Sequence, residues 1–381
     1  MKPAFLALLA LAVVSPGNAS AFETKARAAM VVDHTTGMAL LRKNETTPLP
    51  TASMSKLMTL YMLFEAIRDE RVTLDTEFRV SKKAQAMGGS RMFVEADTTV
   101  PVDALIHGII VQSGNDACVV VAENLAGTED EFAKQMTARA RELGLDGTTL
   151  KNSSGWPEPG HEMSTEDLVK LARMIITEFP EYYEYFAETE YTWNEITQQN
   201  RNPLLNLGIG ADGLKTGHTE EAGYGLVGSA VQNGQRIVFV ITGLDSTSER
   251  RSESEAVVQW AYGAFDTVRF LEKGSVATVG DVWLGEVNSV PLVAATDIQM
   301  LVPRQLRDEV KAEITYEGPI EAPITAGQVI GALVVSVPDQ EDVTFDLVAG
   351  ADVERGGLVT RIGAAAALAR DRVVQLLPGG D

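Results

Sequence analysis

Cysteine is almost absent from this chain: of its 381 residues, only Cys118 is a cysteine. A single cysteine excludes an internal disulfide and a cysteine-based metal site. Histidine is nearly as scarce, and the four residues His34, His107, His161 and His218 are widely scattered, so the sequence predicts no metal site. Cys118 lies in the apolar run Cys-Val-Val-Val-Ala, and we expect it to be a buried packing residue.

Positive charge is also in short supply. The chain has 32 lysine and arginine residues against 53 aspartate and glutamate residues, which gives a formal net charge of −21 at pH 7. Most of such a surface would repel a nucleic acid, so we exclude nucleic-acid binding. A small anionic substrate is not excluded, because it responds to the local field of a cleft rather than to the net charge.

Long hydrophobic runs are missing as well, apart from a short one at the start. Lys2 precedes the apolar residues 5–14, and Ala19-Ser-Ala21 offers a small-residue cleavage site. This arrangement is typical of an export signal, so we expect residues 1–21 to be removed and the mature chain to begin at Phe22. A retained membrane anchor fits less well, because the run is shorter than the roughly 20 apolar residues that span a bilayer.

The sequence does contain the apolar patterns of a globular protein, and hydrophobic residues make up 45% of it. Residues 22–272 show strand patterns at both ends and helical periodicity between them. This order predicts an α/β (α+β) catalytic domain with an antiparallel sheet flanked by helices. The strand patterns cover 28–41, 213–219, 224–231 and 236–244; the helical patterns follow an expected cap at Thr51 and cover 102–110, 115–124, 130–143, 165–179 and 252–265.

Residues 273–355 have a different texture, which predicts a small all-β sandwich domain. Short β-rich segments alternate there with glycine, proline and aspartate, at 275–284, 289–294, 299–302, 310–316, 329–337 and 343–347. The final residues, 356–381, place leucine, isoleucine, valine and alanine in one stripe, and we expect an amphipathic helix. Its arginines favour contact with a membrane surface, whereas its alanine-rich stripe leaves packing on protein, or disorder, open.

Three short motifs follow one another along the first domain: Ser53-Met-Ser-Lys56, Ser113-Gly-Asn115 and Lys215-Thr-Gly217. Each one alone is common by chance in a chain of this length. The three in this order, each in the local structure that its chemistry requires, indicate a serine acyl-transfer site.

Ser53 and Lys56 are the candidates for nucleophile and base. A serine hydroxyl is a weak nucleophile near neutral pH unless a neighbouring group takes its proton. Lys56 follows one helical turn after Ser53, so its amine can reach the serine oxygen. Because an ordinary lysine is protonated at neutral pH, Lys56 needs a lowered pKa, which burial and the nearby cation Lys215 would provide.

The second motif supplies hydrogen-bonding groups from a loop that precedes a helix. Ser113 is suited to pass a proton to a departing amine. Asn115 can fix Lys56 and a substrate amide, since its side chain both donates and accepts hydrogen bonds.

The third motif lies on a predicted strand that would line the site. Lys215, with Thr216 and Thr219, can bind a terminal carboxylate, and Gly217 would leave room for an extended peptide. We expect the backbone amides of Ser53 and His218 to form an oxyanion hole.

The residues around these motifs carry a family resemblance. They are Thr51-Ala-Ser-Met-Ser-Lys56, Val111-Gln-Ser-Gly-Asn-Asp-Ala-Cys118, Asn200-Arg-Asn202 and Asp212-Gly-Leu-Lys-Thr-Gly-His-Thr219. With them the chain resembles the penicillin-binding D-alanyl-D-alanine carboxypeptidases of the type of penicillin-binding proteins five and six, from the export signal to the β-rich domain.

The resemblance implies hydrolysis of the terminal D-Ala from peptidoglycan stem pentapeptides and covalent inhibition by β-lactams such as penicillins. Ser53 would be acylated, Lys56 would be the base for acylation and for the deacylating water, and Ser113 would protonate the leaving group. Lys215 and Arg201 would supply positive charge near the substrate carboxylate. No metal or other cofactor would be needed.

The resemblance also implies a place in the cell. The enzyme would be exported to the periplasm and act on the cell wall, in peptidoglycan biosynthesis and cell shape. The C-terminal helix would contact the outer face of the inner membrane peripherally, although the family's anchor is usually richer in aromatics and lysine.

Three alternatives use the same motifs. A β-lactamase would hydrolyse the acyl-enzyme fast, but Glu166 is followed by Asp167-Leu168 instead of the Leu-Asn context of class A enzymes. A DD-endopeptidase or transpeptidase would differ only in the acceptor and in the shape of the cleft. A non-catalytic cell-wall binding protein would not need the intact motif residues that this chain has.

Overall fold

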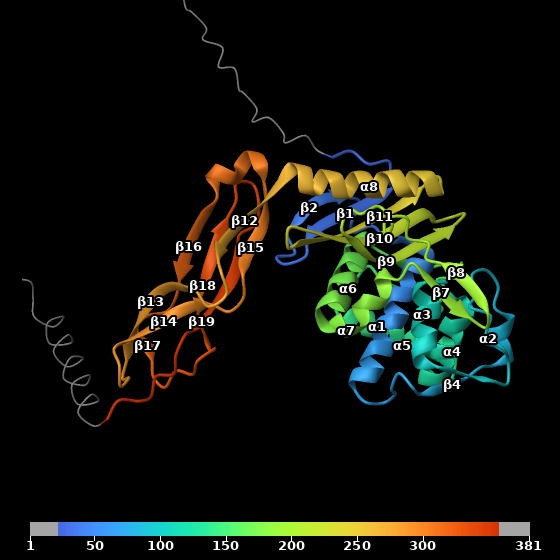
Figure 1. The fold of residues 1–381 in the computed structure, drawn as a ribbon, viewed down its shortest axis with the longest axis horizontal. Helices are drawn as coiled ribbons and strands as arrows, with labels where there is room; N and C mark the ends of the chain where they lie inside the picture. Colours follow the sequence, from blue (N-terminus) through green and yellow to red (C-terminus); the bar gives the residue numbers. More distant parts are fainter. Residues whose placement is uncertain (1–21, 358–381) are drawn as a thin grey trace, which may run out of the picture.

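The computed structural model describes residues 22–357. The expected export signal at 1–21 lies outside the described residues, and so does the expected C-terminal helix apart from its first two residues. Within the described part, an antiparallel sheet with helices on both faces is followed by an all-β segment (Figure 1). This arrangement confirms the predicted fold class. We call residues 22–264 the α/β part and residues 265–355 the all-β part.

The sheet of the α/β part has five antiparallel strands in the order β2-β1-β11-β10-β9. Strands from both ends of this part lie side by side, as the apolar patterns predicted. β9 is an edge strand, so one side of it is free for another chain segment. The strands are β1 (Ala28–Asp33), β2 (Ala39–Lys43), β9 (Ala211–Thr219), β10 (Gly223–Gln232) and β11 (Gln235–Leu244).

Helix α8 (Thr247–Ala264) covers one face of this sheet, and the other helices gather on the opposite face (Figure 1). Each face is closed by its own core of buried apolar side chains. The helices of the opposite face are α1 (Lys56–Arg68), α2 (Lys82–Ala86), α3 (Val102–Ile110), α4 (Asn115–Ala126), α5 (Glu129–Glu142), α6 (Thr165–Glu178) and α7 (Pro180–Tyr183), with the 3-10 helix η2 (Glu184–Ala187).

Three short antiparallel pairs, which the apolar patterns did not predict, brace the loops between these helices. They are β3 (Leu49–Pro50) with β6 (Glu162–Met163), β4 (Glu77–Arg79) with β5 (Thr99–Pro101), and β7 (Glu190–Trp193) with β8 (Ile196–Gln199). Strands of two to four residues are too short to show a clear period, so only the fold brings the partners together.

Two helix starts differ from the sequence prediction. Thr51 makes no side-chain capping bond, because its backbone is already in the helical region; the 3-10 helix η1 (Ala52–Ser55) follows it directly. Helix α8 begins at Thr247, five residues before the predicted start at residue 252. Ser246 caps it by accepting a hydrogen bond from the backbone N–H of Glu249, a capping signal that the apolar period does not report.

The all-β part forms a six-stranded sheet in the order β16-β18-β19-β14-β13-β17 and a two-stranded pair, β12 with β15. β12 follows α8 with no linker. The bounds are β12 (Phe265–Leu271), β13 (Val276–Trp283), β14 (Ser289–Ala294), β15 (Ile298–Pro303), 3-10 helix η3 (Arg304–Glu309), β16 (Lys311–Thr315), β17 (Ile320–Glu321), β18 (Val329–Ser336) and β19 (Val343–Ala349).

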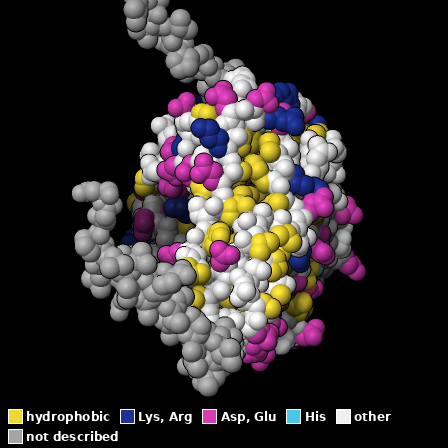
Figure 2. Space-filling view, turned by 90° about the vertical axis from the view of Figure 1, so that its left-hand side faces the viewer, with side chains coloured by type: hydrophobic (Ala, Val, Ile, Leu, Met, Phe, Trp, Pro, Cys, Tyr) yellow, Lys and Arg dark blue, Asp and Glu magenta, His cyan; other side chains and the backbone are white. Residues whose placement is uncertain are grey.

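The outer face of the all-β part is unusually apolar. Figure 2 looks at this face and shows hydrophobic side chains grouped across it, with acidic side chains around them. Val276, Val279 and Val329 are each more than half exposed. Exposed apolar groups gathered in this way are typical of an interaction surface. Within residues 22–357, no helix has the length and apolar content to cross a membrane.

A buried carboxylate joins the two parts. Asp33, the last residue of β1, is fully buried. Its Oδ2 accepts a hydrogen bond at 2.8 Å from the backbone N–H of Leu301 in β15, and its Oδ1 accepts one at 2.7 Å from Gln235 of β11. Burial raises the pKa of the Asp33 carboxyl, while backbone hydrogen bonds from Leu301 and Thr35 act against that rise.

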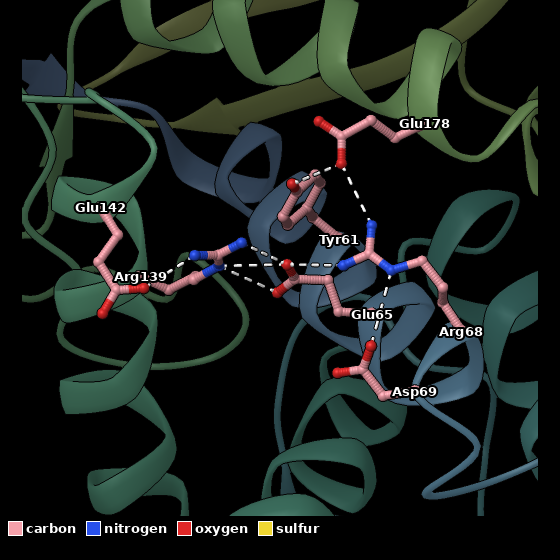
Figure 3. A network of polar contacts seen from close by, with 7 residues as sticks. All are labelled: Tyr61, Glu65, Arg68, Asp69, Arg139, Glu142 and Glu178. Atoms are coloured by element: carbon pink, nitrogen blue, oxygen red, sulfur yellow. Dashed lines mark hydrogen bonds and ion pairs between the residues drawn. The ribbon is translucent and has the colours of Figure 1, made fainter.

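A polar network holds α1 against its neighbours (Figure 3). Glu65 of α1 accepts three hydrogen bonds from the guanidinium of Arg139 in α5, the shortest 2.6 Å long. Tyr61 and Arg68, on the same helix, both donate to Glu178 of α6, at 3.0 and 3.3 Å. Because Glu65 is largely buried, this network fixes the position of α1 more firmly than exposed ion pairs would.

We expect Glu65→Gln to lower the free energy of unfolding by about 2 kcal/mol, because Arg139 would lose its buried partner. The matched control is Glu142→Gln, which removes the other carboxylate bound to Arg139. Glu142 is largely exposed, so its loss should cost less than about 0.5 kcal/mol. Urea denaturation of both variants measures the difference, and equal losses would contradict the role given to Glu65.

Candidate active site

Ser53 and Lys56 meet at the junction of η1 and α1, on the helix that the Glu65 network holds. Ser53 is half-buried, whereas Lys56, the first residue of α1, is fully buried. The Lys56 Nζ lies 2.8 Å from Ser53 Oγ, 2.7 Å from Asn115 Oδ1 and 2.5 Å from the backbone oxygen of Ser154. The first two motifs are therefore joined through one amine.

The three partners of Lys56 determine what its amine can do. The carbonyl oxygens of Asn115 and Ser154 can only accept hydrogen bonds. The orientation of Asn115 is fixed by its Nδ2, which donates to the backbone oxygen of Gly88 at 2.9 Å. A neutral Lys56 amine therefore uses its two hydrogens on these oxygens and points its lone pair at Ser53 Oγ. That is the geometry of a general base.

Burial, together with the positive charge of Arg201, lowers the pKa of Lys56 to about 8. About a tenth of the amine is thus neutral at pH 7, compared with less than about a thousandth for an ordinary lysine. Cys118, which is buried nearby, has a pKa raised by burial to about 12 and stays a neutral thiol. It fills space next to Lys56, as its apolar context predicted.

Lys215 and Ser113 form the second half of the same buried group. The Lys215 Nζ donates to Ser113 Oγ at 3.0 Å and to the backbone oxygen of Thr216 at 3.3 Å. Burial lowers the pKa of Lys215 well below its usual value, and the charges of Lys56 and Arg201 lower it further. Ser113 has a φ of 57°, in the left-handed region that non-glycine residues seldom adopt.

Strand β9 presents the third motif along one wall of the site. His218 and Thr219 line the cleft, while Thr216 is buried beside Lys215. At Gly217, a Cβ would lie 2.6 Å from the backbone oxygen of Thr51. The missing side chain therefore makes room for the turn that carries Ser53.

Arg201 lies at the rim, outside the buried group of lysines and serines. Its Nη1 donates a hydrogen bond to Ser90 Oγ. The backbone oxygen of Ser90 in turn accepts from the N–H of Asn115 at 2.8 Å. Arg250 of α8 lies behind, buried, and donates to the backbone oxygen of Arg201 at 3.4 Å. The sequence-predicted arginine is thus linked to the second motif through Ser90.

The site opens to solvent through a cleft of about 530 Å³. Ser53 and Asn115 lie in its wall, so the nucleophile is accessible while Lys56 and Lys215 stay buried beneath it. The remaining lining residues are Gly89, Ser90, Gly155, Trp156, Pro157, His218, Thr219, Glu220 and Glu221.

Sequence reasoning missed the loop at 152–157, which supplies the third partner of Lys56. The Asn152 side-chain oxygen accepts backbone hydrogen bonds from Ser154, Gly155 and Trp156, at 2.9 to 3.2 Å. These bonds hold the Ser154 carbonyl against the Lys56 amine. The run Asn152-Ser-Ser-Gly155 followed by prolines indicates a structured turn, and this loop could have been predicted from it.

Asp116 is a second residue that the motifs did not single out as part of the site. Its buried carboxylate accepts hydrogen bonds from the backbone N–H groups of Met92, Phe93 and Val94, at 2.8 to 3.2 Å. These bonds fasten the segment after Ser90 to the start of α4. The cleft wall is therefore held from the same helix that carries Asn115.

The third missed residue, His161, supports the turn that carries Ser53. Its Nδ1 accepts from the backbone N–H of Lys151, so Nε2 carries the proton and donates to Ser55 Oγ at 3.0 Å. Ser55 donates in turn to the backbone oxygen of Ala52. Burial and the charge of Lys56 lower the pKa of His161 to about 4, so the ring is neutral.

Residues 22–357 contain no cluster of three or more His, Cys, Asp or Glu fit to hold a metal.

A substitution of Gly155 can test how tightly the loop at 152–157 packs on the turn that carries Ser53. A Cβ there would lie 2.0 Å from the backbone oxygen of Ala52, whereas at Gly160 the nearest atom would be 3.5 Å away. Both glycines have a φ in the left-handed region, at 74° and 79°. Gly160→Ala therefore controls for backbone strain, and we expect Gly155→Ala to lower the free energy of unfolding by about 3 kcal/mol more. Similar urea midpoints for the two variants would refute this packing.

Comparison with known proteins assigns the chain to a family. Residues 15–246 match the model of the family described as D-alanyl-D-alanine carboxypeptidase, and residues 265–355 match the family described as penicillin-binding protein 5, C-terminal domain. D-alanyl-D-alanine carboxypeptidase DacD from Escherichia coli (strain K12) is 36% identical over 341 residues, which cover 87% of this chain and 88% of that protein.

Solved structures agree with the sequence matches. Penicillin-binding protein 5 from Haemophilus influenzae matches with a TM-score of 0.77 at 32% identity, over 90% of this chain and 100% of that chain. Penicillin-binding protein D2 from Listeria monocytogenes, in its ampicillin-bound form, matches with a TM-score of 0.57 at 29% identity, over 62% and 97%. The chain therefore belongs to the D-alanyl-D-alanine carboxypeptidases of the type of penicillin-binding proteins five and six, the family that its motifs predicted.

Proposed function

We propose that this protein removes the terminal D-Ala from peptidoglycan stem pentapeptides through an acyl-enzyme on Ser53. The observation that carries the proposal is the position of the buried Lys56 amine, which lies 2.8 Å from Ser53 Oγ and within hydrogen-bond distance of the carbonyl oxygens of Asn115 and Ser154. This arrangement gives a buried serine–lysine pair one defined direction of proton transfer.

In the acylation step, Lys56 takes the Ser53 proton as Oγ attacks the carbonyl carbon of the penultimate D-Ala. The backbone amides of Ser53 and His218 are the proposed donors to the oxyanion. Collapse of the tetrahedral intermediate breaks the bond to the terminal D-Ala, whose nitrogen receives a proton from Ser113. Lys215 supports that transfer, because its hydrogen bond stabilises negative charge on Ser113 Oγ. The proton that Lys56 took from Ser53 then passes to Ser113, which leaves Lys56 neutral for the next step.

In the deacylation step, water takes the place of the departed D-Ala. Lys56 removes a proton from this water, which attacks the ester carbonyl and releases the shortened peptide, and Ser53 recovers its proton. The same residues serve both steps, so no further acid, base or cofactor enters the proposal.

The substrate carboxylate is the proposed partner of Lys215, Thr216 and Arg201. Lys215 and Arg201 lie together with Lys56 in a chain whose net charge is −21, so the site attracts an anion that the rest of the surface repels. Thr219 accepts from the N–H of Ala222 at 3.0 Å and is better suited to shape the end of β9.

Penicillins are the proposed covalent inhibitors, since a β-lactam offers Ser53 an amide carbonyl in place of the D-Ala-D-Ala peptide bond. The Listeria protein in its ampicillin-bound form supports this part of the proposal. We further propose export to the periplasm with loss of residues 1–21, peripheral contact with the inner membrane through residues 356–381, and a role in cell shape. The apolar face of the all-β part suits a spacer that also contacts another surface.

The central test measures D-Ala released from a stem pentapeptide ending in D-Ala-D-Ala, together with labelling by a fluorescent penicillin. We expect both for the wild type, and we expect Ser53→Ala to lose the label and to release D-Ala about 10,000-fold more slowly, because it lacks the nucleophile. A wild type that neither releases D-Ala nor takes the label would refute the proposal. Fast release of hydrolysed penicillin would instead indicate a β-lactamase.

The pKa of Lys56 predicts the pH profile of acylation. Because the neutral amine is the base, we expect the rate of penicillin acylation to rise with pH and level off above pH 8. Arg201→Gln removes a charge that lowers this pKa, so the midpoint should move up by about half a pH unit.

The control for this profile is Arg251→Gln, which removes an exposed arginine of α8 and should leave the midpoint unchanged. Lys56 and Lys215 are coupled, so the midpoint is a property of the pair. A midpoint that does not differ between Arg201→Gln and Arg251→Gln would contradict the electrostatic role of Arg201.

A further inference from the structure

The cleft continues past Ser53 into a region that the proposed chemistry does not use. Two chain segments line it there. Trp156 and Pro157 come from the loop at 152–157, and Glu220 and Glu221 come from the turn between β9 and β10. One segment contributes apolar surface and the other contributes two carboxylates.

The order of residues along β9 indicates which part of a substrate reaches this region. An extended peptide that pairs antiparallel with this edge strand places its C-terminal carboxylate near Lys215 and Thr216. Thr219 ends the strand four residues beyond Lys215, which is about 13 Å further along. Two D-Ala residues and the residue before them cover most of that length, so the third residue from the end lies beside Thr219 and Glu220.

The two carboxylates at this end have no partner of their own. Both glutamates are exposed, and neither forms an ion pair with any residue between 22 and 357. No lysine or arginine of the described chain lines the cleft, so Glu220 and Glu221 supply the negative charge of its lining. The turn is held in place, because Ala222 donates to Thr219 and Arg27 donates to the backbone oxygen of Glu221.

The apolar segment complements these charges. Trp156 is 45% exposed and lies over the backbone of Gly88 and Gly89, where an added Cβ would meet its ring at 3.2 and 3.0 Å. The ring therefore offers a fixed apolar surface on the cleft. A side chain with a methylene stem and a terminal amine can place the stem against Trp156 and the amine near the glutamates.

We propose that Trp156, Glu220 and Glu221 form a specificity subsite for the residue that precedes D-Ala-D-Ala, selecting a diamino acid with a free side-chain amine. This inference rests on the proposed carboxypeptidase function and adds the substrate class. Lys215 and Arg201 hold the carboxylate end of the peptide, while the glutamates hold the cationic side chain on the acyl side of Ser53.

The test compares kcat/KM for two peptides that differ only in this amine, Nα-acetyl-L-Lys-D-Ala-D-Ala and its Nε-acetylated form. We expect the wild type to prefer the free amine by about 3- to 10-fold, since each exposed carboxylate adds a modest attraction that salt weakens. The double variant Glu220→Gln/Glu221→Gln should lose this preference and keep its rate of penicillin labelling.

The matched control is Glu181→Gln/Glu184→Gln, which removes two exposed glutamates from α7 and η2 that do not line the cleft. It changes the net charge equally and should retain the preference. D-Ala release without any preference, or a preference that survives in Glu220→Gln/Glu221→Gln, would overturn the subsite and leave the carboxypeptidase function intact. No D-Ala release from either peptide would instead refute the function itself.

Discussion

The rest of the site depends on the burial of one amine. Lys56 is held by the carbonyl oxygens of Asn115 and Ser154, and these come from two distant segments of the chain. Desolvation lowers the pKa of Lys56, and the two carbonyls decide which way its lone pair points. The supporting contacts of Asn152, of His161 and of the network at Glu65 all serve this position. A lysine in the same motif on an exposed helix would stay protonated, and no fixed partners would orient its amine.

The net charge of the whole chain and the charge around the site have opposite signs. Over the whole chain acidic residues dominate, with a net charge of −21, whereas Lys56, Lys215, Arg201 and Arg250 gather at one place. Each cation lowers the proton affinity of its neighbours, so the cluster attracts a carboxylate and also prepares Lys56 as a base. Substrate binding and activation of the nucleophile therefore draw on the same set of charges.

The sequence predicted the sheet, most helices and the grouping of the three motifs, because these depend on periodicity and on local spacing. It did not predict the part played by Ser154 or His161, since both contact Lys56 or its turn through backbone groups and buried hydrogen bonds. The sequence also did not predict that Gly217 makes room for the backbone of Thr51, a contact that only the packing of β9 on η1 creates. Short strand pairs such as β3 with β6 have no period to read.

The junction of the two parts has a mechanical consequence. Helix α8 passes into β12 with no intervening residue, and Asp33 binds the backbone of β15 from within the α/β part. A flexible tether would let the cleft take many positions relative to the all-β part. This junction instead makes the all-β part a stiff extension of the α/β part, so the cleft keeps a fixed distance and angle to the strands of the all-β part.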